Sequence, residues 1–302
     1  MNRENSPATL EQPTDRTHNA FNHRSDHNSP VVEVRGGPGR LSKESLVELW
    51  HFREVLWAFV VRHVKVKYKQ AAVGIGWSVV QPVFSAVLFA IFLGRLANIP
   101  SEGVPYVLFA LAGMIAWTFF SSAAGSAMES LVADQALLRK VYFPREILPM
   151  AAIGAGLVDL LIGLLTLVIA AALFGIWPSL AWLALPLPLL VLIISATAVG
   201  LGVSALNVYY RDVRYTLPFV LQLGLFVSPV VYPLGMVPPA WRTLYAIVNP
   251  VASAIDGLRR IVIHQSPPDW GITLVALVWS LLLLMGAAFL FKRLERSLAD
   301  RV

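Results

Sequence analysis

The chain has 302 residues, of which 57% are apolar and only 14% are charged, and its mean hydropathy is +0.66. So few charges cannot coat a soluble globule of this length, so the composition favours a protein with a lipid-facing surface. A net charge of +6 would indicate nucleic-acid binding in a soluble protein, but Lys and Arg sorted to one side of a membrane give the same excess. The absence of cysteine excludes disulfides and thiolate metal sites.

Residues 1–42 are polar and contain no apolar run, which predicts a disordered cytoplasmic tail rather than a cleaved signal peptide. Three histidines occur there, at His18, His23 and His27. Without neighbouring cysteines or ordered structure they indicate a solvated tail, and no metal site is expected in the chain.

Residues 43–70 form the next predicted unit, a helix lying on the membrane surface. From Ser45 to Val64 apolar residues recur at helical spacing and acidic residues take the other side, and Ser45 with Glu48 fits a capping box. The basic cluster Arg62–Lys69 that follows can lie against anionic lipid headgroups. The alternative is a short soluble helix packed on another part of the protein.

Residues 71–291 predict an all-α membrane domain. A hydrocarbon layer of about 30 Å needs about 20 apolar residues, and six stretches of that size carry almost no charge. They are 71–94, 103–128, 147–174, 179–210, 215–241 and 270–291, the third and fourth being separated by turn residues at Gly175–Pro178.

Lys and Arg near these spans predict the orientation. Fourteen of them flank one face and four flank the other. Because the cytoplasmic side carries the excess of basic residues, both termini are expected in the cytoplasm, residues 292–302 forming a short cytoplasmic tail.

The segment between the fifth and sixth spans is broken at Asn249–Pro250, and neither half is long enough to cross a bilayer. Two short helices that dip in from the outer face and turn back account for this pattern. Asp256, Arg259 and Arg260 fall on one side of the second piece, which predicts an outer vestibule or gate. Ordinary packing at the interface is the alternative.

The connector between the second and third spans mixes apolar, aromatic and basic residues. This composition predicts a small helix that stops before Pro144 and presents an amphipathic surface to a cytoplasmic partner. The alternative is interfacial anchoring by aromatic rings plus basic charge. Tyr209–Arg214, on the same face, is a second candidate contact. The candidate coupling residues are Arg139, Lys140, Tyr142, Phe143, Arg145 and Glu146.

Asp159 lies near the middle of the third span, where an ionised side chain is costly unless it is paired or hydrated. It is therefore a functional candidate. The structural alternative is a hydrogen bond to a neighbouring helix, and an acid without a basic companion would make a poor proton relay. Among the many aromatic residues, Phe84 and Tyr232 lie near prolines and are the candidates for lining a translocation path.

No catalytic or nucleotide-binding motif occurs in the chain. A Gly-x-x-x-x-Gly-Lys-Ser/Thr loop, a Gly-x-Ser-x-Gly elbow and a His-Glu-x-x-His motif are all missing. We therefore expect no enzyme, no catalytic residues and no bound cofactor, and any ATP-driven work needs a partner.

Four segments together carry a family resemblance: Tyr68–Pro82, Leu138–Glu146, Tyr210–Val213 and Ser228–Pro233. The chain resembles type-two ATP-binding-cassette exporter permeases over about residues 45–298, and among them the branch that exports O-antigen, capsular polysaccharide or teichoic acid. The resemblance implies a polysaccharide or lipid-linked glycan as substrate and a location in the bacterial inner membrane.

The same resemblance implies a homodimer around a central path and two copies of a cytoplasmic ATPase subunit that uses ATP and Mg. It further implies that the surface helix and residues 138–146 touch those subunits, and that residues 244–263 form periplasmic gate helices. ATP binding would push on the connector and widen the path, and hydrolysis would reset it. Membrane lipids are expected partners, and nucleic acid is not. A drug or lipid efflux permease of the same fold is one alternative. The other is a membrane-embedded glycan or lipid transferase, which the missing motifs disfavour.

Overall fold

A computed structural model describes residues 43–69, 74–138 and 140–298. Every regular element in these residues is a helix and none is a strand, which confirms the all-α prediction. The predicted tail of residues 1–42, the candidate coupling residue Arg139 and residues 299–302 lie outside the described residues.

Five helical stretches in the described residues are long and apolar enough to cross a membrane. The first is α3 (Gly76–Phe89), which continues as the π-helix η1 (Ala90–Leu96). The others are α4 (Tyr106–Ala133), α6 (Ile147–Leu173), α7 (Pro186–Tyr209) with the preceding 3-10 turn η2 (Leu180–Ala184), and α11 (Trp270–Leu298). The predicted tail after Phe291 therefore begins as the last two turns of α11.

The fifth predicted span, residues 215–241, is not a full-length helix in the structure. Its helix, α8 (Val213–Val227), has only 15 residues. At about 1.5 Å per residue it is ~22 Å long, less than the ~30 Å hydrocarbon layer. Pro229 disfavours helical backbone at the preceding residue, and Ser228 is extended, with φ −77° and ψ 149°. Six full-length spans are thus not confirmed.

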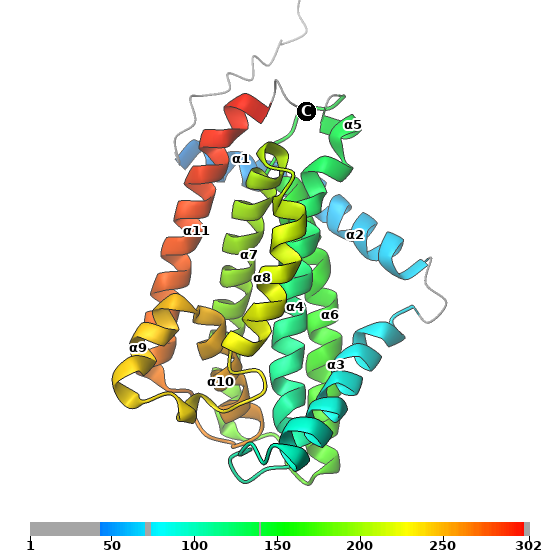
Figure 1. The fold of residues 1–302 in the computed structure, drawn as a ribbon. Helices are drawn as coiled ribbons and strands as arrows, with labels where there is room; N and C mark the ends of the chain where they lie inside the picture. The colour runs from blue at the N-terminus through cyan, green and yellow to red at the C-terminus, as the bar shows by residue number, and fades with distance from the viewer. Residues whose placement is uncertain (1–42, 70–73, 139, 299–302) are drawn as a thin grey trace, which may run out of the picture. The chain divides into compact units, whose positions relative to one another are not determined.

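Helix α4 is the centre of the bundle and is buried along most of its length. It packs against α6 and α7 and also contacts α3, α8 and α10, while α11 lies along α7 (Figure 1). Small residues allow these close approaches. A Cβ on Gly163 of α6, for example, would come within 2.8 Å of Ile115 on α4.

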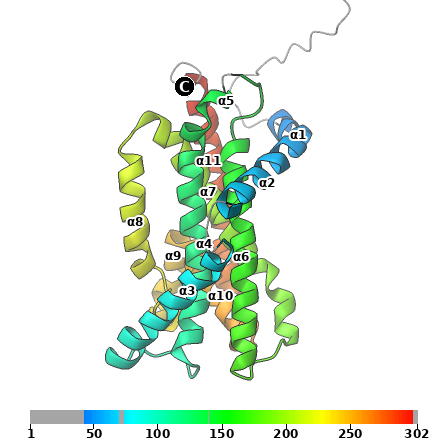
Figure 2. The same cartoon turned by 90° about the vertical axis from the view of Figure 1, so that its right-hand side faces the viewer.

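Helices α1 (Lys43–His51) and α2 (Arg53–Lys69) replace the single predicted surface helix, and α2 extends through the whole basic cluster. Helix α2 crosses α6 (Figure 2), with Val60 so close that a Cβ on Gly154 would meet its Cγ2 at 2.9 Å. Trp50 and Trp57 are exposed. Helix α1 begins before the predicted cap Ser45, whose side chain lies outside the described residues.

The predicted small helix of the connector is wrong for most of its length. Helix α5 covers only Gln135–Leu138, and residues 140–146 form turns and irregular backbone up to the start of α6. Pro144 disfavours helix at Phe143, and the ring of Phe143 packs instead on Phe59 of α2. The proline and the packing of Phe143 on α2 together account for the irregular backbone of the connector.

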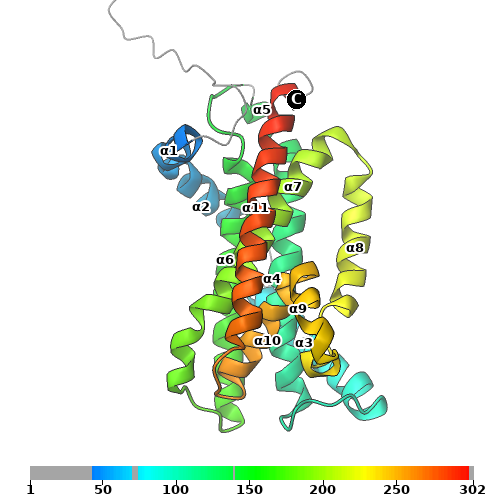
Figure 3. The same ribbon diagram turned by 90° about the vertical axis from the view of Figure 1, so that its left-hand side faces the viewer.

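The predicted break at Asn249–Pro250 is confirmed. A 3-10 turn, η3 (Leu234–Met236), precedes α9 (Pro239–Val248) and α10 (Pro250–Val262), and Asn249 alone separates these two helices. Helix α10 is buried along nearly its whole length, against α7 and α4. Both short helices lie toward the end of the bundle opposite α1 and the last turns of α11 (Figure 3).

Candidate functional site

The connector of residues 140–146 presents some predicted coupling residues and buries others. Lys140 and Tyr142 are exposed, whereas Phe143 and Glu146 are buried. The Tyr142 hydroxyl donates a hydrogen bond of 3.2 Å to Glu48 on α1, and the ring centroids of Phe143 and Phe59 are 5.5 Å apart. The connector is thus attached to the α1–α2 segment.

A buried charge cluster joins the other end of the connector to α11. Lys292 lies 2.5 Å from Glu146 and 3.1 Å from Glu295, and Arg145 donates to the backbone oxygen of Glu295. Burial, and after it the charge of Glu295, raises the pKa of Glu146. The cluster fixes the start of α6 to the end of α11.

The second candidate contact, Tyr209–Arg214, runs from the last residue of α7 to the second residue of α8. Its Tyr209 hydroxyl donates to the backbone oxygen of Leu294 on α11 at 2.8 Å. Arg214 lies 3.6 Å from Glu129, and both side chains are half exposed. An exposed pair of this kind contributes little stability, so these charges remain available to a partner.

Arg259, one of the residues predicted to form an outer vestibule or gate, is buried inside the bundle. Its guanidinium donates to the carbonyl oxygens of Phe109, Pro229, Val230 and Tyr232 and lies 3.5 Å from the centre of the Phe109 ring. Helix periodicity placed it beside Asp256 and Arg260, but Gly113 of α4 leaves room for it inside the bundle. Arg259 therefore joins α10, α4 and the turn after α8.

The remaining predicted gate residues form two separate contacts. Asp256 and Arg260 are paired at 2.8 Å within α10. Asn249 donates to the Ser228 hydroxyl at 2.7 Å, and Pro250 is buried as the first residue of α10. The helix junction is thus tied to the end of α8 by a side-chain hydrogen bond.

Asp159 is the acceptor at the centre of a polar cluster, and it has a basic companion that no local sequence pattern indicates. Lys67 lies 2.6 Å from it, Tyr68 donates at 2.6 Å and Ser78 donates at 2.5 Å. These groups come from α2, from α3 and from α6. Burial, and after it the bond to Asp159, raises the pKa of Tyr68, so this phenol stays a protonated donor.

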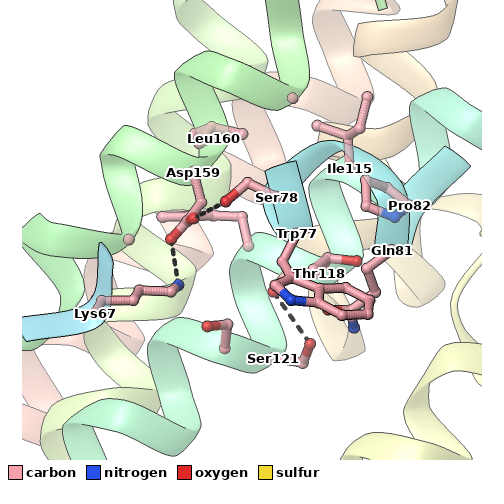
Figure 4. A pocket seen from close by; sticks show the side chains of 14 residues that line it. Lys67, Trp77, Ser78, Gln81, Pro82, Ile115, Thr118, Ser121, Asp159 and Leu160 are labelled. Atoms are coloured by element: carbon pink, nitrogen blue, oxygen red, sulfur yellow. Dashed lines mark hydrogen bonds and ion pairs between the residues drawn. The ribbon is translucent and has the colours of Figure 1, made fainter. Parts of the chain in front are cut away.

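A cavity of about 340 Å³ opens beside this cluster, between α2, α3, α4 and α6. Figure 4 shows the Lys67–Asp159–Ser78 contacts at its edge, with Trp77, Gln81, Thr118 and Ser121 around it. Its lining combines hydroxyl and amide groups, one indole ring and apolar helix surface. The full lining is Lys67, Trp77, Ser78, Gln81, Pro82, Ile115, Thr118, Phe119, Ser121, Ser122, Gly156, Asp159, Leu160 and Gly163.

The two predicted path residues do not line this cavity. Phe84 is exposed on α3. The Tyr232 hydroxyl donates to the backbone oxygen of Val227 at 2.7 Å and lies 3.1 Å from the Tyr245 hydroxyl. The aromatic residues that line the cavity are Trp77 and Phe119, and Trp77 lies in the segment Tyr68–Pro82, one of those that carry the family resemblance.

The described residues contain no group of three or more His, Asp or Glu that could hold a metal ion.

The sequence of the chain is similar to those of known polysaccharide export proteins. The chain is 24% identical over 256 residues to the O-antigen export system permease protein RfbA of Myxococcus xanthus, covering 84% of this chain and 98% of that protein. It is 25% identical over 265 residues to RfbA of Klebsiella pneumoniae, covering 86% of this chain and 99% of that protein. It is 22% identical over 206 residues to the polysialic acid transport protein KpsM of Escherichia coli, covering 68% of this chain and 80% of that protein.

The family described as ABC-2 type transporter matches residues 54–263, which run from the start of α2 to the end of α10. The match contains the connector, the Asp159 cluster with its cavity, and Arg259. This multi-pass membrane protein belongs to the ABC-2 type transporter family.

Proposed function

We propose that this chain is the permease subunit of an ATP-driven exporter that moves a polysaccharide, or a lipid-linked glycan of the O-antigen or capsule type, across the bacterial inner membrane. The observation that carries the proposal is the family match together with alignments that cover nearly the whole length of O-antigen export permeases. The chain carries no nucleotide-binding loop, so a separate ATPase subunit supplies the energy.

In this arrangement the chain crosses the membrane six times with both termini in the cytoplasm. The five long helices supply five crossings, and α8 with residues 228–238, which include the 3-10 turn η3, completes the sixth. Irregular backbone at membrane depth is tolerated where protein covers it, and Ser228 and Val230 are buried. The excess of Lys and Arg at one end of the bundle supports the orientation.

The connector is the proposed contact for the ATPase, two copies of which would serve a homodimer of this chain. Lys140, Val141 and Tyr142 expose a basic, apolar and aromatic surface. Behind that surface, Phe143 packs on α2 and Glu146 is paired with α11. A push on the exposed part would therefore reach two helices at once. ATP and Mg would be bound by the partner and not by this chain.

The gate role proposed for α9 and α10 is supported by how they are held. Arg259 attaches α10 to the turn after α8, and Asn249 attaches the helix junction to Ser228. The end of α8, the turn and both short helices would then move as one unit when the path opens. This assigns Arg259 a positioning role within the gate rather than contact with the substrate.

The proposal is tested in a strain that lacks this chain, by measuring glycan at the cell surface and inside the cell. The intact chain should restore surface glycan. Lys140→Glu, which reverses an exposed connector charge, should lower it several-fold with build-up inside. The matched control is Arg95→Glu, the same reversal at an exposed position at the other end of the bundle.

Equal surface glycan with and without the chain would contradict the polysaccharide proposal and favour drug or lipid efflux. Equal loss in Lys140→Glu and Arg95→Glu would leave export intact as a function but contradict the coupling role of the connector.

A further inference from the structure

We propose that the cavity beside Asp159 is a carbohydrate subsite that seats an uncharged mono- or disaccharide unit of the exported glycan. The inference rests on the proposed function and adds to it a binding site within a single subunit. It stands on the chemistry of the lining, the charge balance, and the size and opening of the cavity.

The lining offers the two kinds of contact that a sugar ring needs. Gln81 supplies an amide, and Thr118, Ser121 and Ser122 supply hydroxyls that can donate and accept. The Ser121 hydroxyl donates to the backbone oxygen of Trp117 at 2.8 Å, which leaves its lone pairs free to accept from a sugar hydroxyl. The indole of Trp77 supplies a flat apolar face for the C–H side of the ring.

The charges at the edge of the cavity cancel, which favours a neutral ligand over an anion. Lys67 and Asp159 are in contact at 2.6 Å, and Asp159 also accepts hydrogen bonds from Tyr68 and Ser78. With these partners the carboxylate carries no unbalanced charge, and Lys67 is already neutralised. A phosphate or an acidic sugar would have to displace Asp159 from Lys67, whereas a neutral hydroxyl can join the network unchanged.

The volume of about 340 Å³ falls near the lower end of the range of about 300–1,000 Å³ found for ligand pockets. It therefore suits a short piece of glycan rather than a long one. Gly156 on α6 lines the cavity, and a Cβ built on it would lie 3.5 Å from the ring of Phe119 on α4.

The cavity is open on one side, where Trp77 and Gln81 of α3 are exposed. A sugar unit seated inside could therefore remain connected to a chain that continues outside. A site of this kind can release one unit and take up the next as a long polymer moves past it.

The absence of cysteine allows a direct test in the full-length protein. Ser122→Cys places one thiol on the cavity wall, and Lys140→Cys places one on the exposed connector as the labelling control. A water-soluble, membrane-impermeant thiol reagent is added to opened cells that either make the glycan or lack its first sugar transferase.

We expect Cys at position 122 to react in the cells without glycan and to react about tenfold more slowly in the cells with it, because an occupied site protects in proportion to ligand over Kd. The control thiol should react equally in both. Equal rates at position 122 would overturn the subsite, and so would no reaction in either strain, since a dry cavity cannot hold a sugar.

A second variant tests the cavity without labelling. Gly156→Leu, whose Cβ lies 3.5 Å from the ring of Phe119, should narrow the cavity and lower export several-fold while the Tm in detergent stays the same. Gly125→Leu, on α4 where a Cβ meets nothing within 4 Å, should leave both export and Tm unchanged. Normal export by Gly156→Leu would overturn the subsite. Export that persists in the strain without this chain would instead overturn the proposed function, so the two failures are distinguishable.

Discussion

Two charged side chains inside the helical bundle, Asp159 and Arg259, are satisfied in opposite ways. Asp159 has a charged partner, Lys67, whose side chain is half exposed, and it borders a cavity. Arg259 is 2% exposed and is held by carbonyl oxygens and a ring rather than by a carboxylate. The first charge can be hydrated and re-paired, while the second can leave its site only if the surrounding backbone moves. This difference favours a binding role for Asp159 and a structural role for Arg259, which holds α10, α4 and the turn after α8 together.

Substituting Arg259 should have the largest effect. Arg259→Lys replaces a fork of five donors by one ammonium that cannot reach four carbonyl oxygens, and each buried group left unpaired costs about 1–3 kcal/mol. We expect a loss of about 3 kcal/mol or more in the free energy of unfolding, seen as a lower Tm in detergent. The neighbour Arg260→Lys, in a partly exposed pair, should change it by about 0.5 kcal/mol. Equal losses of unfolding free energy in Arg259→Lys and Arg260→Lys would contradict the structural role of Arg259.

Gly113→Ala should have the next largest effect and tests how closely Arg259 is packed. The added Cβ would lie 2.6 Å from both the Arg259 Nη2 atom and the backbone oxygen of Val230. Overpacking of this kind costs about 1–3 kcal/mol. The control Gly125→Ala, on the same helix in open space, should be neutral or gain up to about 1 kcal/mol from helix propensity. An unchanged Tm for Gly113→Ala would contradict the close packing of Arg259 and Val230 against Gly113.

The Lys67–Asp159 pair should show a smaller effect that can be isolated. Because Lys67 is half exposed, we expect Lys67→Met and Asp159→Asn to be coupled by only about 1 kcal/mol in a double-mutant cycle. Thermal unfolding of the two single variants and the double variant measures this coupling. Additive losses of stability in the double variant would mean that the contact between Lys67 and Asp159 does not stabilise the protein.

Glu146 is a third charged side chain inside the protein. It is buried like Arg259, but it is paired with a charged partner like Asp159. We expect its substitution to have the smallest effect on Tm. Its pKa is raised above the ordinary value of 4.5 by burial and by Glu295. A raised folded-state pKa means that its stabilising contribution is complete below 4.5 and is lost as pH rises through the folded value. The Tm of the intact protein relative to Glu146→Gln should therefore fall as pH rises through that window. A constant Tm difference across the window would contradict the raised pKa.

The sequence predicted what depends on composition and local pattern. The all-α fold, the long apolar helices and the break at Asn249–Pro250 follow from apolar length and from proline, and the structure contains all three. The fifth span was overestimated because hydropathy continues past Ser228, where Pro229 ends the helix.

The sites were predicted less well because they depend on contacts between distant residues. Lys67 and Asp159 are 92 residues apart, and no local pattern pairs them. Arg259 was grouped with Asp256 and Arg260 by helix periodicity, but its burial depends on the space beside Gly113 of a different helix. The connector residues were identified as a group, yet only the fold separates exposed Lys140 and Tyr142 from buried Phe143 and Glu146.

The central claim, ATP-driven glycan export through this chain, is tested most directly in proteoliposomes that contain the purified chain and its ATPase subunit with lipid-linked glycan. The account predicts glycan movement across the bilayer that requires ATP and both subunits, and that falls several-fold with Lys140→Glu but not with Arg95→Glu. Movement without the ATPase, or ATP hydrolysis that leaves glycan on its original side while a small lipid is moved, would contradict it.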